Sequence, residues 1–368
     1  MKKKEGKLVM KKEFSLNQKE LTSIIINILT VKLFFIYPKK LIMNSGNAAW
    51  IEMIYVSLLI IPILFFLLKS YKRSVNPNLI ELSEKVGGKF LKILIGILLT
   101  VALFLNLATT IRSYPEIVKM VLLPNTPINF IVLVFAIVFG IAAYFGMESI
   151  GRIHSIFIPA MLGILAIFFL FLIPHTKIYN IFPIFGKGTE KIFFYGTEAL
   201  DFFDDLVILG ILVPYARNEK EAKTSIIKGT FISSLLGILI ILFYCLIYPY
   251  PSSQNFLVPI YQLTRLVGIG DFFQRFEAFF EFIWSFSILL YSSFYILVIS
   301  IVLRDTFDLK YEKPLIFPVL AVVIILSFGA YDMQDIVFNY WYLSFFTVFM
   351  AFGVPIILSM IYKKRRKK

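Results

Sequence analysis

Apolar runs of membrane-spanning length recur along the whole chain, separated by short polar segments that hold proline, glycine and basic residues. About 20 apolar residues suffice for an α-helix to cross a bilayer. No segment alternates apolar and polar positions in the way that barrel strands do. The pattern predicts an all-α polytopic membrane protein with one domain between residues 15 and 362. Its ten spans fall at about 15–37, 48–68, 90–118, 128–144, 156–173, 191–213, 226–247, 272–303, 315–328 and 336–362.

Composition agrees with this class, because hydrophobic residues make up 59% of the chain and charged residues only 16%. Soluble domains have about half apolar and about a quarter charged residues. Chemistry-bearing residues are scarce: Cys245 is the single cysteine, and the two histidines, His154 and His175, fall in predicted loops. We therefore expect no metal site and no cofactor. Nucleotide-binding and hydrolase motifs are also missing from the sequence, so we expect a protein that is not an enzyme.

Basic residues give the chain a net charge of +14. In a soluble protein this charge would suggest nucleic acid, but here the basic residues flank the spans, so membrane topology explains them and no nucleic-acid partner is expected. Most of them fall on one side of the membrane if the N-terminus is inside. The distribution predicts that both termini are cytoplasmic, with a basic segment at residues 1–14 and a basic tail at 363–368.

Four acidic residues lie in the middle of the sixth predicted span: Glu198, Asp201, Asp204 and Asp205. A carboxylate near the bilayer centre costs on the order of 3 kcal/mol or more, so these side chains cannot face lipid. On an α-helix their spacings of three and four place them, together with Thr197, on one face. That face is expected to look into a protein interior or a water-filled cavity. Its carboxylates are suited to an ammonium group, a sodium ion or a proton.

Lys32 is the matching anomaly in the first span, where Asn27 and Thr30 also interrupt the apolar run. One interpretation is that Lys32 takes the place of a bound cation or moves a proton, since burial lowers the proton affinity of lysine. The other is that it is a counter-ion for Asp201 or a neighbouring acid, or reaches toward the membrane interface. The acids, in turn, either bind a ligand or form buried ion pairs with Lys32 or Arg112.

The first and sixth spans correspond if the chain is a repeat of five and five spans, at about 15–173 and 191–362. Polar-interrupted spans at matching positions are typical of inverted-repeat transporters, whose broken helices form a site near the membrane midplane. We predict ligand-binding roles for Asn27, Thr30, Val31, Asn106, Gly196, Thr197, Glu198, Asp201 and Phe202. We predict ion or proton coupling for Lys32, Asp204 and Asp205.

Other intramembrane polar residues have a simpler interpretation available. Asn106 either bonds a neighbouring helix or lines a cavity. Arg112, Tyr114 and Glu116 lie nearer the outer end of the third span, as a gate or an interface anchor. Near the start of the eighth span a set of charged, aromatic and serine residues suggests an outer vestibule followed by a closely packed stripe: Arg275, Glu277, Glu281, Trp284, Ser285, Ser287, Ser292 and Ser293.

Several short motifs, taken together in order and spacing, resemble those of a known family. They are Arg112-Ser-Tyr-Pro-Glu116, Leu122-Leu-Pro-Asn-Thr-Pro127, Gly146-Met-Glu-Ser-Ile-Gly-Arg152, Asn180-Ile-Phe-Pro183, Val213-Pro-Tyr215 and Arg275-Phe-Glu277. From about residue 15 to 362 the chain resembles the spore germination permeases. These are the B subunits of GerA-type nutrient germinant receptors, in the amino acid, polyamine and organocation superfamily.

The resemblance implies a ten-helix LeuT-like fold in which helices one and six are unwound at the ligand site. It implies a sensor of a small nutrient such as an amino acid. A membrane A subunit and a lipoprotein C subunit in the spore inner membrane would be its partners. Lys32 and the density of acids in the sixth span depart from the family pattern and favour a cationic or differently charged ligand. The alternatives are a proton- or sodium-coupled amino acid or amine transporter, and a structural subunit without a ligand.

Overall fold

The structure is a computed structural model that describes residues 15–35, 37–73, 78–267, 276–329 and 344–367. The predicted basic N-terminus, Arg275 and the first part of the tenth span lie outside these residues. The long helices are α1 (Gln18–Thr30), α3 (Ala49–Arg73), α4 (Leu79–Val121), α5 (Ile128–Tyr144), α6 (Gly146–Leu172), α9 (Glu219–Ile247), α11 (Phe276–Thr306), α12 (Ile316–Ser327) and α14 (Val354–Lys367). The shorter helices are α2 (Tyr37–Ser45), α7 (Thr189–Phe193), α8 (Leu209–Leu212) and α10 (Pro259–Thr264).

Short 3₁₀ and π segments connect these helices. The 3₁₀ segments include η1 (Val31–Phe34), η2 (Gly46–Ala48), η3 (Ile173–His175), η4 (Ile178–Ile181), η5 (Tyr195–Ile208), η6 (Val213–Tyr215), η7 (Ser252–Asn255) and η8 (Lys313–Leu315), and η9 (Phe349–Gly353) is π-helical. The long predicted loops at 174–190 and 248–271 therefore contain short helices in their described parts. No strand element occurs among the described residues, and the all-α prediction is confirmed.

Six helical stretches in the described chain are long and apolar enough to cross a membrane: Tyr37–Lys69, Leu79–Val121, Gly146–His175, Glu219–Ile247, Glu277–Thr306 and Ser344–Arg365. Two shorter apolar helices, Ile128–Tyr144 and Lys313–Ser327, lie between them. The chain is an integral membrane protein. The count of ten spans stays a prediction, because the first and sixth predicted spans are interrupted and fall outside this set.

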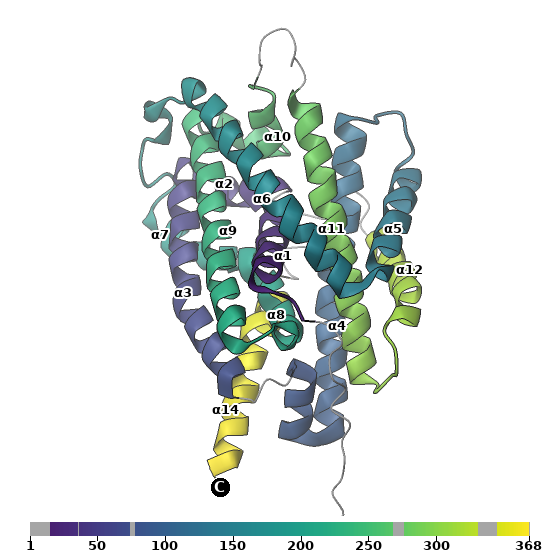
Figure 1. The fold of residues 1–368 in the computed structure, drawn as a ribbon. Helices are drawn as coiled ribbons and strands as arrows, with labels where there is room; N and C mark the ends of the chain where they lie inside the picture. The colour runs from purple at the N-terminus through teal and green to yellow at the C-terminus, as the bar shows by residue number, and fades with distance from the viewer. Residues whose placement is uncertain (1–14, 36, 74–77, 268–275, 330–343, 368) are drawn as a thin grey trace, which may run out of the picture.

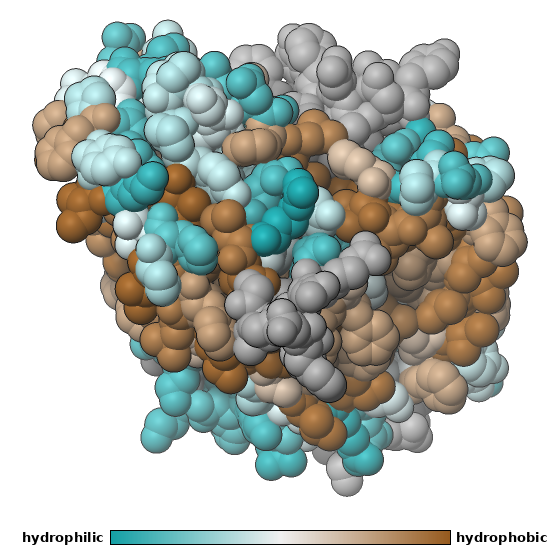
Figure 2. All heavy atoms as spheres, turned by 90° about the horizontal axis from the view of Figure 1, so that it is seen from above, coloured by the Kyte–Doolittle hydropathy of each residue, from teal (hydrophilic) through white to brown (hydrophobic). Residues whose placement is uncertain are grey.

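The outer surface of the bundle is suited to lipid. Large exposed apolar side chains occur on several helices, for example Phe65, Phe130, Phe231 and Ile325. Figure 2 views one end of the bundle and shows hydrophilic side chains gathered between hydrophobic flanks. Because exposed apolar area of this extent is unfavourable in water, the surface fits a bilayer.

The first helix lies in the interior and is broken. α1 packs against α9, α6 and α11, and Figure 1 shows it inside the bundle between α9 and α11. An Asn17–Glu20 capping box starts α1, which runs to Thr30 and tightens into η1. The chain then resumes as α2, whose second residue is Pro38. Proline lacks the N–H that would bond the carbonyl four residues earlier, so a helix cannot run unbroken through this position, whereas proline is tolerated in a first turn.

The sixth predicted span is not an α-helix over most of its length. Tyr195–Ile208 is wound as the 3₁₀ segment η5, fourteen residues long, and only α8 continues it in α form. Runs of 3₁₀-helix beyond three or four residues are uncommon, because their hydrogen bonds are poorer. Contacts with α1, α2, α3 and η9 surround η5. Tertiary contacts, rather than local propensity, therefore maintain this segment.

Candidate ligand site at the broken helices

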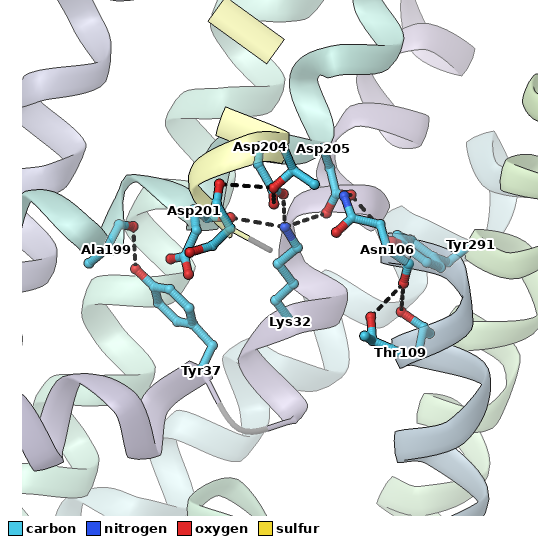
Figure 3. A network of polar contacts seen from close by, with 12 residues as sticks. Lys32, Tyr37, Asn106, Thr109, Ala199, Asp201, Asp204, Asp205 and Tyr291 are labelled. Atoms are coloured by element: carbon cyan, nitrogen blue, oxygen red, sulfur yellow. Dashed lines mark hydrogen bonds and ion pairs between the residues drawn. The ribbon is translucent and has the colours of Figure 1, made fainter. Parts of the chain in front are cut away.

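Lys32 joins the end of the first helix half to the acidic segment. Its ammonium group forms ion pairs with Asp204 and with Asp205, the latter at 3.0 Å between Nζ and Oδ2. It also donates a hydrogen bond to the backbone carbonyl of Asp201 at 2.9 Å. Figure 3 shows Lys32 reaching from η1 into the turn of η5 that carries these three residues. These contacts agree with the interpretation of Lys32 as a counter-ion, and its partners are Asp204 and Asp205.

The second half of the first helix contacts the same segment from beyond the break. The Tyr37 hydroxyl donates to the carbonyl of Ala199 at 2.9 Å. Lys40 pairs with the Asp201 carboxylate at 2.5 Å between Nζ and Oδ2, and donates to the carbonyl of Glu198 at 3.2 Å. Asp201 is therefore bonded through its backbone to Lys32 and through its side chain to Lys40.

The 3₁₀ winding changes which acids share a face. Residues three apart are eclipsed on a 3₁₀-helix, so Glu198, Asp201 and Asp204 follow one another along one edge of η5. Asp205 is rotated by about 120° around the η5 axis relative to Asp204. The prediction of a single α-helical face that also includes Asp205 and Thr197 is wrong, because the backbone has three residues per turn here.

Asp204 and Asp205 tie η5 to different helices. Asp204 accepts a hydrogen bond at 2.7 Å from Thr347, which precedes η9. Asp205 accepts from the side chains of Tyr295, of Tyr291 at 3.2 Å and of Asn106 at 3.4 Å. Asn106 is on α4 and both tyrosines are on α11, so Asn106 bonds a neighbouring segment rather than standing alone. The cluster links the first helix, η5, α4, α11 and the last helical stretch.

Charge in this cluster does not balance. Asp201, Asp204 and Asp205 are completely buried, and Lys32 is only 8% exposed. Two lysines, Lys32 and Lys40, are paired with these three carboxylates. In addition, Asp201 Oδ1 is buried without a hydrogen-bond partner in the described structure. An uncompensated buried charge is strongly unfavourable, so the arrangement is suited to one more proton, cation or hydrogen-bond donor.

Glu52 is a fourth buried acid at η5, beside Asp201, Asp204 and Asp205, and sequence reasoning missed it. It is 1% exposed and accepts hydrogen bonds from Ser45 at 2.5 Å and from Asn44 at 2.8 Å. A Cβ atom added to Gly196 would lie 3.1 Å from Glu52 Cγ, so the small residue permits this approach. The available signal was an acid within the second predicted span.

Several predicted ligand residues have other partners. The Asn27 amide nitrogen lies 3.2 Å from His154 Nε2 and donates to the Ser287 carbonyl at 3.1 Å, and the Ser287 hydroxyl donates to its oxygen. Asn27 thereby connects α1, α6 and α11. The prediction that His154 lies in a loop is wrong, because it is completely buried in α6. Thr30 donates at 2.7 Å to the Ile26 carbonyl within its own helix.

The remaining predicted residues divide between the interior and the surface. Val31 and Phe202 are completely buried, and the Phe202 ring packs against Tyr37 with centroids 5.1 Å apart. Thr197 is exposed and its hydroxyl donates to the Phe194 carbonyl at 2.7 Å. Thr197 thus lies outside the cluster.

Arg112 was considered as an ion-pair partner of the acids in the sixth span, but the structure gives it another partner. It pairs with Glu116 at 2.9 Å, one helical turn along α4. Its guanidinium also lies over the Phe328 ring, 5.6 Å from the centroid. Arg112 is buried at 6% exposure, whereas the Glu116 side chain is partly accessible at 22%.

An all-α membrane bundle with interruptions in its first and sixth predicted spans, facing each other across buried charges, defines a protein of the LeuT-like transporter fold. The structure is similar to that of Mhp1, a nucleobase-cation-symport-1 family transporter, solved in a closed conformation with bromovinylhydantoin bound. The TM-score is 0.65 at 12% identity, covering 89% of this chain and 75% of that one. The inward-facing conformation of Mhp1 gives a TM-score of 0.61 at 12% identity, covering 93% and 76%. The predicted fold class is confirmed.

The chain belongs to the Spore germination protein family, which it matches over residues 15–335. It is 24% identical to spore germination protein B2 of Bacillus subtilis (strain 168), over 89% of this chain and 90% of the relative. It is also 24% identical to spore germination protein A2 of the same organism, over 90% of each. The family resemblance inferred from the motifs is confirmed. The chain is a germination-related membrane protein and not an enzyme.

Proposed function

We propose that this chain is the membrane subunit of a spore germinant receptor, which binds a small nutrient between the broken first helix and η5. Binding changes the arrangement of these segments, and that change passes to partner subunits to start germination. The family and its B. subtilis relatives support the germination role. The fold supports a site at the broken helices, because broken helices in this class supply ligand-binding backbone groups and helix ends near the midplane.

The observation that carries the proposal is the position of Asp201. Both halves of the broken helix are bonded to it, and its Oδ1 atom keeps a buried acceptor position open in the described structure. A nutrient that donates an N–H or O–H group to Oδ1 would satisfy this acceptor. It would also change the pairing of Asp201 with Lys40, and thereby act on both helix halves at once.

Lys32, Asp204 and Asp205 have the coupling role in this proposal. Their ion pairs and hydrogen bonds extend to α4, α11 and Thr347, so a shift of η5 at Asp201 moves contacts on three other parts of the bundle. Two discrete arrangements of such a network can carry a signal between distant surfaces. The partners in the proposal are a membrane A subunit and a lipoprotein C subunit in the spore inner membrane, with both termini of this chain on the core side.

Deletion and complementation test this role. Spores of the source organism that lack the chain should lose the response to at least one nutrient in a panel of amino acids, sugars and nucleosides, and the wild-type gene should restore it. A strain without any other germinant receptors is the reference for the absence of a response. If spores that lack the chain respond to every nutrient of the panel as the wild type does, the proposal is contradicted.

The unbalanced buried charge favours a second function, a proton- or sodium-coupled transporter of amino acids or amines. Three carboxylates facing two lysines leave room for one transported cation. Uptake of labelled amino acids into proteoliposomes that contain the full chain separates the two functions. Concentrative uptake driven by a proton or sodium gradient would establish the transporter, whereas binding without accumulation supports the receptor.

A further inference from the structure

One face of α2 is bonded to two different buried acids. Lys40 and Asn44 are one turn apart on this helix, so their side chains share that face. The Lys40 ammonium group pairs with Asp201 Oδ2 on η5 at 2.5 Å. Asn44 donates to Glu52 Oε1 on α3 at 2.8 Å. The second half of the first helix is thus held between α3 and η5, and Lys40 carries the charge on its bonded face.

Glu52 has hydrogen bonds but no counter-ion. Its carboxylate accepts from Asn44 and from the Ser45 hydroxyl, and the residue is buried. No ion pair is found at Glu52 among the residues that the structure describes. The positive charge of Lys40 acts on this carboxylate, and the negative charge of Asp201 acts on it in the opposite sense. Glu52 is therefore a buried acid that lacks a paired cation and lies near one.

Lys40 is suited to serve either acid. Lysine carries its ammonium group on a flexible four-carbon stem, and the Lys40 side chain is 20% exposed rather than fixed in a closed core. Glu52 lies directly against the start of η5, since a Cβ atom added to Gly196 would be 3.1 Å from Glu52 Cγ. Both carboxylates thus border the same segment, and α2 with Lys40 contacts it as well.

Occupation of Asp201 by a ligand favours a change of partner for Lys40. A positively charged donor that binds Asp201 supplies the charge that Lys40 supplies in this structure. Two cations on one carboxylate repel each other, while Glu52 still lacks a cation. A buried charge is strongly unfavourable without compensation, so the pairing of Lys40 with Glu52 leaves both acids compensated.

We propose that Glu52 is a positioning residue, which takes the Lys40 ammonium group when a positively charged group of the nutrient engages Asp201. This inference rests on the proposed nutrient site at Asp201. The exchange replaces an ion pair between α2 and η5 by one between α2 and α3. The second half of the first helix thereby changes its partner when the nutrient binds, and this change is the movement that the receptor passes on.

The exchange can be tested without a nutrient, because Asp201→Asn removes the competing charge. Unfolding of the purified full-length chain in detergent is measured for Lys40→Met, Glu52→Gln and the double variant, in the wild-type and in the Asp201→Asn background. The coupling of Lys40 with Glu52, expressed as a ratio of unfolding equilibrium constants, should be at least fivefold larger with Asp201→Asn. Equal coupling in both backgrounds overturns the proposal.

Glu52→Gln is a conservative change at this position. Glutamine keeps an acceptor for Asn44, and its amide can donate to the Ser45 hydroxyl, which also contacts the Leu41 carbonyl. Should this variant not fold, Lys40→Met in the Asp201→Asn background decides. There it should raise the unfolding equilibrium constant at least tenfold, since Lys40 then serves Glu52. An unchanged or lower constant overturns the proposal.

Germination of spores tests the exchange in the presence of nutrient. Glu52→Gln should raise the half-maximal nutrient concentration at least tenfold, but less than twofold in a Lys40→Met background, where no ammonium group is left to move. An equal effect in both backgrounds would mean a merely structural role and overturns the proposal. Where Lys40→Met spores do not respond, the unfolding measurements decide.

Two references complete the germination experiment. Glu148→Gln is the same substitution at an acid that pairs with Arg152 on α6, and it should match the wild type. Asp201→Asn reports on the nutrient site itself. A wild-type response of Asp201→Asn spores means that the proposed nutrient site has failed, whereas the coupling of Lys40 with Glu52 in detergent reports on the exchange alone.

Discussion

Replacement of Lys32 by methionine probes the buried cluster most strongly. Methionine keeps most of the volume and apolar stem of lysine, so little packing is lost, but the ammonium group disappears. In the structure that group compensates Asp204 and Asp205 and bonds the Asp201 carbonyl. Without it, Lys40 alone faces three buried carboxylates.

The expected loss of stability follows from this burial. Removing one partner of a buried ion pair costs about 3–5 kcal/mol, because the remaining charge is buried without compensation. Lys32 serves two fully buried acids, so the Lys32→Met variant should lie in the upper part of this range. Removing the opposing charge as well should return part of the loss. The double variant Lys32→Met with Asp205→Asn is therefore expected to be more stable than Lys32→Met alone.

A double-mutant cycle on the full-length protein in detergent measures this effect. Reversible unfolding in denaturant, followed by tryptophan fluorescence, gives the free energy of unfolding for the wild type, both single variants and the double variant. A coupling energy of at least about 1.5 kcal/mol between Lys32 and Asp205 is expected. If Lys32→Met costs less than about 1 kcal/mol, or if the two changes are additive, the buried pair does not have the role described here.

Three other substitutions test the fold. Tyr37→Phe removes the hydrogen bond to the Ala199 carbonyl and should lower the free energy of unfolding by about 0.5–1.5 kcal/mol in the same assay, whereas no change would mean that this bond does not stabilise η5. Gly96→Ala places a Cβ atom 2.1 Å from Thr306 Oγ1 and should cost about 1–3 kcal/mol, with recovery in the Gly96→Ala, Thr306→Ala double variant; a lack of recovery would exclude this contact as the cause. Pro38→Ala removes the obstacle to a continuous first helix and should weaken the germination response while the protein still accumulates in the membrane; a wild-type response would show that the break does not depend on proline.

The protein class and the main charged residues of the site could be predicted from the sequence. Both depend on the free energy of placing each side chain in lipid or away from it. Apolar runs must be buried in lipid, and acids within them must avoid it, so Asp201, Asp204, Asp205 and Lys32 could be singled out from their positions alone. The pairing of Lys32 with two acids was among the predicted alternatives. Family motifs then supplied the LeuT-like fold, which the similarity to Mhp1 confirms.

The rest depends on geometry that local pattern does not specify. The 3₁₀ winding of η5 is maintained by tertiary contacts, so an α-helical face for all four acids was the natural but incorrect expectation. Pro38, which directly follows the predicted end of the first span, is a sequence signal for the break. The burial of His154 against Asn27 could not be read from sequence, because a lone histidine near a span end is equally compatible with a loop.

Asp201 is the residue on which the proposed nutrient site depends, and a germination dose–response curve for Asp201→Asn spores tests it most directly. The variant keeps the size of the side chain and removes its charge, and Glu148→Gln spores with equal protein levels are the control. We predict that Asp201→Asn raises the half-maximal nutrient concentration at least tenfold or abolishes the response, while Glu148→Gln matches the wild type. An Asp201→Asn curve that superimposes on the wild type would contradict a nutrient site between the broken first helix and η5.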